Sequence, residues 1–208
     1  MSAPPVLAAD TWTTNAHLIE DVARLGYLQP TDRVLDPTYG RGVWWQRWMP
    51  GELVAHDLGM DGVDFRYLPH DAGTFDAAAY DPPYVCVGGR RTTGTADLHD
   101  RYGLTDAPTT PAGLQELINA GLAEVARVVK PGGIVLCKCQ DYVSSGQLWP
   151  GTYYTTQAAL GMGLRLVDRL EHVAGIRPQP PGRRQVHARR NLSTLLVFRT
   201  PRKGGLYV

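Results

Sequence analysis

One tetrapeptide, Asp81-Pro82-Pro83-Tyr84, groups a carboxylate, a peptide carbonyl and an aromatic ring within four residues. The two prolines restrict the backbone and, because they carry no N–H, leave the Pro82 carbonyl without a local donor. Asp81 and that carbonyl would each accept one hydrogen of a planar aromatic amine, which turns the nitrogen lone pair toward an electrophile. Tyr84 would stack on the ring, an interaction that contributes about 1–3 kcal/mol. The tetrapeptide therefore predicts a clamp for an exocyclic amine.

A glycine-rich loop follows a short apolar run earlier in the chain. Val34-Leu35-Asp36 leads into Pro37-Thr38-Tyr39-Gly40-Arg41-Gly42. A glycine turn after a strand places a ligand at the carboxyl end of that strand, and glycine lets the backbone approach the ligand closely. Trp45 stands where a dinucleotide fingerprint has its third glycine, and no Lys-Ser/Thr pair follows as in a triphosphate loop. Asp36 would repel a pyrophosphate, so the loop favours a cationic ligand, such as one carrying an ammonium group.

Two further carboxylates are expected at the ends of later strands. Asp57 ends the run at 53–57 and could accept hydrogen bonds from ribose hydroxyls, each contributing about 1.5–3 kcal/mol. Asp71 follows the strand candidate at 65–68 and could reach an adenine amino group. Each acid taken alone is better explained as a helix cap or a surface residue than as a ligand contact. The ordered series of acids and glycines at successive strand ends is what predicts one continuous ligand site.

Alternating β and α patterns predict the elements that position these residues. Short apolar runs indicate strands, and apolar residues at helical spacing indicate helices. We expect helices from residue 14 or 15 to 26, after the glycine loop around 44–48, at 114–129 and at 153–160. We expect strands at 33–36, 53–57, 65–68, 75–80, 134–138, 164–173 and 192–199. This alternation predicts an α/β fold with a doubly wound, mostly parallel sheet, in one domain covering residues 1–208.

Two segments do not fit the alternation. Residues 85–111 are rich in Gly, Thr and Arg and are too long for an ordinary connection, so we expect a substrate loop or lid there. Residues 175–190 are expected to form a basic loop that joins the last two strands.

Composition excludes several classes of protein. The chain has 208 residues, 43% hydrophobic and 20% charged, which is close to an ordinary soluble protein. We find no apolar stretch long enough for a membrane span and no signal-peptide pattern at the N-terminus. The three cysteines (Cys86, Cys137 and Cys139) suggest neither a disulfide scaffold nor a zinc site. A cytoplasmic protein without a metal is therefore expected.

The net charge of +1 hides an asymmetry. From His172 to Val208 the sequence contains eight basic residues and no acidic one. This indicates an acidic partner at one end of the molecule or, alternatively, a solvated basic tail.

Four motifs taken together resemble those of the amino-methylating, S-adenosylmethionine-dependent DNA methyltransferases: VLDPTYGRG, AHD, YDPPY and VVKPGGIVLCKCQD. The resemblance covers about residues 11–141, with a looser match at LLVFR. It implies a Rossmann-like methyltransferase fold whose seven-stranded, mostly parallel sheet has an antiparallel last strand. It also implies S-adenosyl-L-methionine as cofactor and DNA with a flipped base as substrate. Asp at the first catalytic position goes with adenine N6 in this family, so adenine is the expected target.

The resemblance implies a role for individual residues. Asp81, Pro82, Pro83 and Tyr84 would be catalytic, in a direct methyl transfer without a covalent enzyme intermediate. Asp36, Gly40 and Gly42 would bind the methionine part of the cofactor, Asp57 its ribose and Asp71 its adenine. The full set of expected cofactor-binding residues is Thr13, Asp36, Pro37, Thr38, Gly40, Gly42, Asp57, Leu58, Asp71, Ala72 and Asp81. Nucleic-acid phosphates would be contacted by arginines of the two loops, namely Arg90, Arg91, Arg101, Arg183, Arg184, Arg189 and Arg190.

Other interpretations of the same residues stay open. An RNA methyltransferase that modifies guanine N2 or adenine N6 of ribosomal RNA would share the fold and a similar tetrapeptide. A cytosine C5 enzyme would need a cysteine nucleophile, for which Cys86 is the candidate nearest the tetrapeptide. A protein glutamine is a further possible acceptor. A non-catalytic binding module would keep the fold without using the tetrapeptide.

Overall fold

The computed structural model describes residues 6–7, 12–86, 108–175, 184–188 and 190–202. Its helices are α1 (Asn15–Arg24), the 3₁₀ helix η2 (Val43–Trp45), α3 (Pro111–Val128) and α4 (Gly151–Gly161). Its strands are β1 (Arg33–Asp36), β2 (Glu52–Ala55), β3 (Phe75–Tyr80), β4 (Val129–Cys139), β5 (Tyr142–Ser144), β6 (Gln147–Trp149), β7 (Arg165–Val173) and β8 (Leu192–Arg199). Most of the predicted loop at 85–111 and the first part of the basic loop at 175–190 lie outside the described residues.

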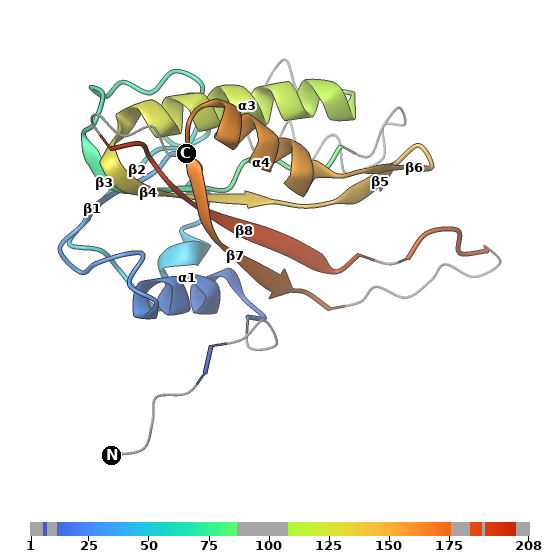
Figure 1. Ribbon diagram of the computed structural model, residues 1–208, viewed down its shortest axis with the longest axis horizontal. Coiled ribbons are helices and arrows are strands. Elements are labelled where there is room, and N and C mark those ends of the chain that lie inside the picture. The colour runs from blue at the N-terminus through green and yellow to red at the C-terminus, as the bar shows by residue number, and fades with distance from the viewer. Residues whose placement is uncertain (1–5, 8–11, 87–107, 176–183, 189, 203–208) are drawn as a thin grey trace.

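A six-stranded sheet forms the centre of the molecule, in the order β2-β1-β3-β4-β8-β7 (Figure 1). The four strands β2, β1, β3 and β4 run parallel, whereas β8 is antiparallel to both of its neighbours. The predicted α/β architecture with an antiparallel last strand is therefore confirmed. The sheet of the described residues has six strands instead of the seven expected.

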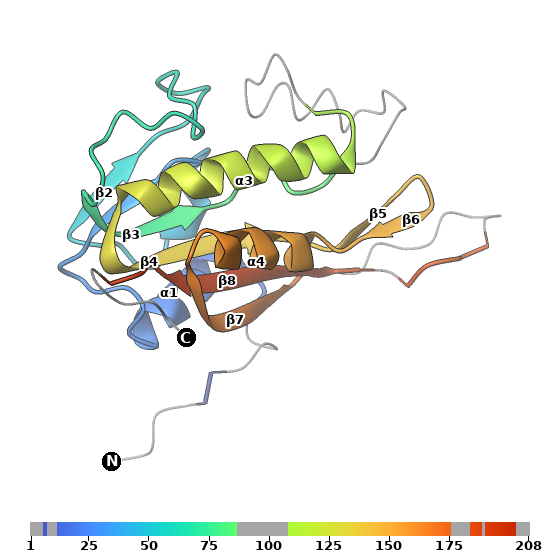
Figure 2. The same cartoon turned by 45° about the horizontal axis from the view of Figure 1, so that its top comes forward.

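Helices cover both faces of this sheet, which is the doubly wound arrangement predicted. α1 and η2 lie on one face, and α3 and α4 lie on the other (Figures 1 and 2). Alternation along β4 supplies both cores, because Ile134 and Leu136 pack toward α1 while Val135 and Cys137 pack toward α3. Each fully buried aliphatic side chain in these layers contributes about 1.5–3 kcal/mol. In the described part of the chain, no helix combines the length and apolar character that a membrane crossing requires.

Local capping explains where the two long helices begin. The Thr14 side chain accepts a hydrogen bond from the His17 N–H at the start of α1. Thr110 does the same for the Gly113 N–H at the start of α3, and Pro111 occupies the first turn, where a missing N–H costs nothing.

The predicted strand at 65–68 is wrong. Asp64 accepts hydrogen bonds from both the backbone N–H and the guanidinium of Arg66, which folds this segment into a turn. Phe65 and Leu68 are still buried, but they reach the α3-side core from an irregular segment. The apolar spacing therefore reflects burial of these side chains in the core and not hydrogen bonding to a neighbouring strand.

The predicted helix at 44–48 is also wrong, because it shortens to the three residues of η2. The adjacent indoles of Trp44 and Trp45 donate to two different carboxylates, Asp81 and Asp36. Two neighbouring side chains that must each reach a separate buried acceptor leave little room for a regular helix.

The region after β4 contains a hairpin that the sequence interpretation missed. β4 itself starts at Val129, five residues earlier than expected, and pairs with β3 through an irregular register near Phe75. β5 and β6 then form a separate two-stranded sheet before α4, which starts at Gly151. The hairpin therefore stands directly after the carboxyl end of β4.

Candidate active site

The carboxyl ends of β1, β2 and β3 bring three of the predicted acids to one edge of the sheet. Asp36 is the last residue of β1, Asp57 lies two residues beyond β2, and Asp81 directly follows β3. Parallel neighbours necessarily end on the same edge, so the sequence order becomes a spatial cluster.

Asp36 is held by two donors in a buried position. Its Oδ1 accepts the Thr38 N–H at 3.0 Å, and its Oδ2 accepts the Trp45 indole N–H at 2.7 Å. Burial raises the pKa of Asp36 to about 7, and the nearby charge of Asp81 acts in the same direction, while the two hydrogen bonds oppose this rise. Near pH 7 this carboxyl is therefore poised between its neutral and charged forms.

The glycine loop is locked onto the end of β2. Asp57 Oδ2 accepts the Gly40 N–H at 3.1 Å, and Asp57 Oδ1 accepts the Gly59 N–H at 2.9 Å. Gly42 has a φ of +64°, and a Cβ there would collide with the Tyr39 ring. Gly40 also has a positive φ, of +54°, so both positions adopt the left-handed backbone conformation that favours glycine.

Asp81 has one carboxylate oxygen engaged and one free. The Trp44 indole donates to Oδ2 at 3.0 Å, and the Asp81 N–H donates to Thr38 Oγ1 at 2.8 Å. Oδ1 is buried and has no hydrogen-bond partner among the described residues. Burial raises the pKa of Asp81, and the charge of Lys138 and the bond from Trp44 oppose that rise. A buried acceptor without a partner is costly in a native protein, so Oδ1 is available to a donor from outside the described residues.

Lys138 is a site residue that the sequence interpretation missed. It lies on β4, is only 2% exposed, and donates to the Asn15 side chain at the start of α1. Its ammonium stands 5.9 Å from the centre of the Trp44 ring. Burial lowers the pKa of Lys138, whereas the charge of Asp81 raises it. A lysine on an otherwise apolar strand, in step with Ile134 and Leu136, was the available signal, because such a residue needs an anionic partner.

The rest of the tetrapeptide packs at the same edge. Pro82 and Pro83 are buried, and Tyr84 is half-buried. Tyr84 lies with Tyr142, Trp149 and residues of α3 and α4 around a gap that is too narrow to hold a water molecule.

Asp71 and Ala72 are not brought to this edge. Both are exposed in the turn before β3, and the Asp71 carbonyl accepts a bond from Thr74. The adjoining Gly73 N–H donates to the carbonyl of Arg127 in the last turn of α3, at the opposite, amino edge of the sheet. The missing strand at 65–68 explains this displacement, because the chain has already turned back before it reaches Asp71.

Asp64 is the acid that lies near the end of β3 instead. Burial raises the pKa of Tyr80, the last residue of β3, and the charges of Cys137 and Asp64 act in the same direction. The neighbouring Phe65 packs edge-on against the Tyr80 ring, with 5.5 Å between centroids. The sequence interpretation named Asp71 because it expected a strand at 65–68, and that strand does not form.

The other predicted residues fall into three groups. Thr13 is exposed beside the N-terminus of α1, whereas Leu58 packs against the α3-side core next to Asp57. Arg184 and Arg190 are exposed in the basic segment. Arg90, Arg91, Arg101, Arg183 and Arg189 lie outside the described residues.

The cysteines are poorly suited to nucleophilic catalysis. Cys86 is buried, and its thiol faces the Pro108 carbonyl at 3.9 Å. Burial raises the pKa of Cys137 well above its usual value and that of Cys139 to about 12. Among the described residues no cluster of His, Cys, Asp and Glu is arranged to hold a metal ion.

Comparisons with known proteins show the fold. No protein-family model matches the chain, and no curated protein matches it in sequence. A candidate methyltransferase from Bacillus halodurans C-125 matches with a TM-score of 0.54 and 13% identity, over 88% of this chain and 98% of that one. TrmN from Thermus thermophilus matches with a TM-score of 0.52 and 17% identity, over 88% of this chain and 48% of that one. The chain therefore has the Rossmann-like methyltransferase fold, as its sequence predicted.

A weaker match is a candidate DNA modification methylase, also from Thermus thermophilus, with a TM-score of 0.42 and 14% identity over 83% of this chain and 55% of that one. The chain thus spans about half the length of both Thermus proteins.

Proposed function

We propose that this chain is an S-adenosyl-L-methionine-dependent methyltransferase that modifies the exocyclic amine of a base in DNA, with adenine N6 as the acceptor. The single observation that carries the proposal is the free, buried Oδ1 of Asp81. An amine N–H donated to this atom would satisfy an acceptor that no described protein group satisfies.

The edge of the sheet fits the cofactor, which when bound supplies a methyl group activated by a sulfonium. Each Asp57 oxygen already accepts one backbone N–H and retains a lone pair for a ribose hydroxyl. Asp36, with Pro37 and Thr38 next to it in the chain, would be held in its charged form by the cationic end of the cofactor. Thr13 would contact the cofactor from the start of α1. Leu58 would line the adenine side, and we assign the adenine contact to Asp64 in place of Asp71.

The residues of the chain would act mainly by positioning the amine. Trp44 fixes Asp81 through Oδ2, so that Oδ1 is the oxygen presented to the substrate. Lys138 favours the carboxylate form of Asp81, which is the form that accepts an N–H. Tyr84 would stack on the base and offset part of the few kcal/mol needed to take it out of a duplex. The methylated amine carries an extra proton that is acidic enough to leave to solvent, so no separate base is required.

Charge supports a nucleic-acid substrate. Arg184 and Arg190 are exposed in a segment whose sequence neighbourhood has no acidic residue. Binding through such contacts weakens steeply as salt rises.

The test is methyl transfer from isotopically labelled S-adenosyl-L-methionine to duplex DNA of mixed sequence, with ribosomal RNA as a parallel substrate. Mass spectrometry of the digested nucleosides identifies the modified atom. We expect N6-methyladenine from DNA in the wild type and none in Asp81→Ala, while calorimetric cofactor binding is retained in both. Cys86→Ser is the matched control and should keep its activity.

Three outcomes would contradict the proposal. Label found only in RNA would move the substrate to that nucleic acid, and activity retained in Asp81→Ala would reject the clamp. Absence of cofactor binding by the wild-type chain would reject the enzymatic role altogether.

A further inference from the structure

The β5–β6 hairpin is built into the edge that carries the candidate site. It is inserted between β4 and α4 and turns through Ser145 and Gly146, both with positive φ. Asp141 accepts the Thr152 N–H at 3.0 Å, which ties the end of β4 to the start of α4 and closes the base of the hairpin. The hairpin and the basic segment extend in the same direction from the sheet (Figures 1 and 2).

A groove separates the hairpin from the basic segment, which we define as residues 184–188 and 190. The groove has a volume of about 350 Å³ and is lined by Arg184, Arg190 and hairpin residues. His187 crosses to the hairpin, where its Nε2 lies 3.0 Å from the Gly146 carbonyl. Among the described residues that line this groove, Arg184 and Arg190 are opposed by one acid, Asp141, so their net charge is positive.

Aromatic rings lead from the tetrapeptide to the surface on the α4 side of the hairpin. Tyr84 and Trp149 lie around the same narrow gap. Trp149 packs on Tyr154 with 4.7 Å between ring centroids, and Tyr154 contacts Tyr153 at 5.5 Å. Tyr153 is 58% exposed and Tyr154 is 38% exposed. Large exposed rings next to a site mark an interaction surface more often than a packing surface.

We propose that the hairpin, the basic segment and the first turn of α4 form the surface that binds the nucleic-acid strand around the target base. Arg184 and Arg190 neutralise phosphates, and Tyr153 and Tyr154 stack on an unpaired base next to the one in the clamp. This inference rests on the proposed function, because it takes the acceptor to be a nucleobase. A positive groove combined with stacking rings is the combination that single-stranded nucleic acid requires.

The contributions of the tyrosine rings and of the arginines can be measured separately, because they depend differently on salt. Loss of the rings removes stacking, which does not depend on salt, whereas loss of the arginines removes phosphate contacts, which do. Tyr153→Ala/Tyr154→Ala should weaken binding by about fivefold to about 150-fold with an unchanged salt slope. Arg184→Gln/Arg190→Gln should lower the slope of log affinity against log salt by roughly 1.4–1.8.

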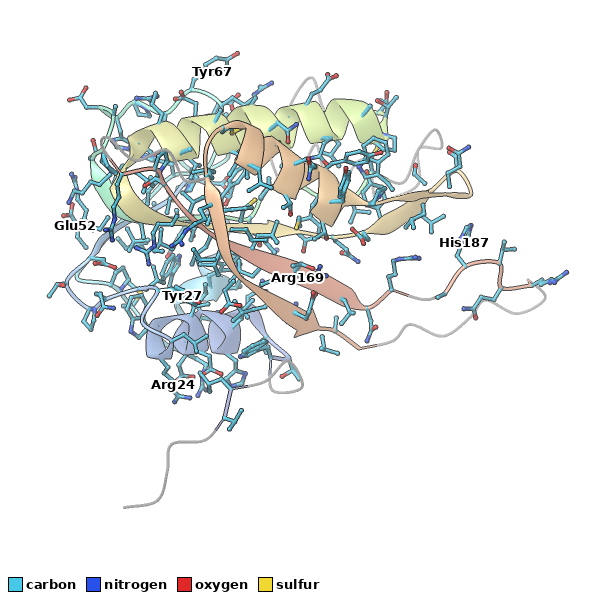
Figure 3. The ribbon with its side chains drawn as sticks, in the orientation of Figure 1. Arg24, Tyr27, Glu52, Tyr67, Arg169 and His187 are labelled. Carbon is cyan, nitrogen blue, oxygen red and sulfur yellow. The ribbon has the colours of Figure 1, made fainter. Side chains whose placement is uncertain are left out.

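The experiment measures fluorescence anisotropy of a labelled single-stranded DNA of mixed sequence, and of its duplex, with the full chain over a salt series. Tyr67→Ala and Arg202→Gln are the controls. Tyr67 is 75% exposed and lies across the molecule from His187 (Figure 3), and Arg202 is exposed beside Gly132, near the start of β4. Circular dichroism during urea titration shows that each variant is folded.

Methylation and cofactor binding are measured on the same preparations, so the two proposals can fail separately. Wild-type DNA methylation with unchanged DNA binding in both double variants would overturn the strand-binding surface alone. The same would follow if the control variants lost as much affinity. A wild-type chain that binds the cofactor but neither DNA form would overturn the nucleic-acid substrate and this surface together.

Discussion

Replacing Trp44 by Phe tests how the Asp81 carboxylate is oriented. The substitution keeps an aromatic ring in a buried position but removes the N–H that donates to Asp81 Oδ2 at 3.0 Å. A hydrogen bond to a charged group contributes about 1.5–3 kcal/mol. If that bond holds the carboxylate in its productive orientation, its loss lowers kcat by about tenfold to about 150-fold.

The matched control is Trp48→Phe. Trp48 lies four residues away, is half-buried, and packs on Trp45 with 6.4 Å between ring centroids. Single-turnover methylation under saturating cofactor gives the rate constant, and calorimetry gives the cofactor affinity, which should hardly change in either variant. Equal rate losses in Trp44→Phe and Trp48→Phe would refute the reasoning, because the effect would then come from packing and not from the hydrogen bond.

Three further predictions concern charge and backbone. Lys138→Met raises the pKa of Asp81, because the lysine charge holds it down, so the loss of activity on acidification should begin at higher pH in the single-turnover rate profile. The pKa of Asp36 is raised to about 7, above that of an unfolded Asp at about 3.9. The unfolded chain therefore releases this proton first, and the free energy of unfolding should fall from about pH 4 to about pH 7. Urea titrations should show a flatter dependence over that range in Asp36→Asn, and an unchanged curve would mean that Asp36 is ionised throughout. Gly42→Ala should lower the free energy of unfolding more than Gly62→Ala, since both have positive φ but only Gly42 faces the Tyr39 ring; equal losses in urea titration would show that the ring simply moves aside.

The parts of the site that were predictable depend on local sequence. A short apolar strand followed by two prolines leaves few conformations, so the position of Asp81 at the end of β3 could be predicted. The same holds for Asp36 and the glycine loop. Apolar spacing likewise predicted the helix at 114–129, which in the structure begins three residues earlier because Thr110 caps it and Pro111 occupies its first turn.

The parts that were missed depend on contacts distant in sequence. The spacing of Trp44 and Trp45 is typical of a helix, but their indole N–H groups donate to two acids, Asp81 and Asp36, that are distant in sequence or in a neighbouring strand. Lys138 looks like an ordinary strand residue until Asn15 is brought opposite it. The hairpin turn at Ser145-Gly146 was visible as a turn signal, but its strands have three residues each and carry almost no pattern.

The contact between Asn15 and Lys138 joins residues that are 123 positions apart. The N-terminal helix must therefore have docked before the lysine beside Asp81 acquires its partner. A chain that has formed only β1 to β4 would contain the whole tetrapeptide but would lack the hydrogen bond from Lys138 to Asn15. The charge around Asp81 is thus complete only when the N-terminal helix is docked against β4.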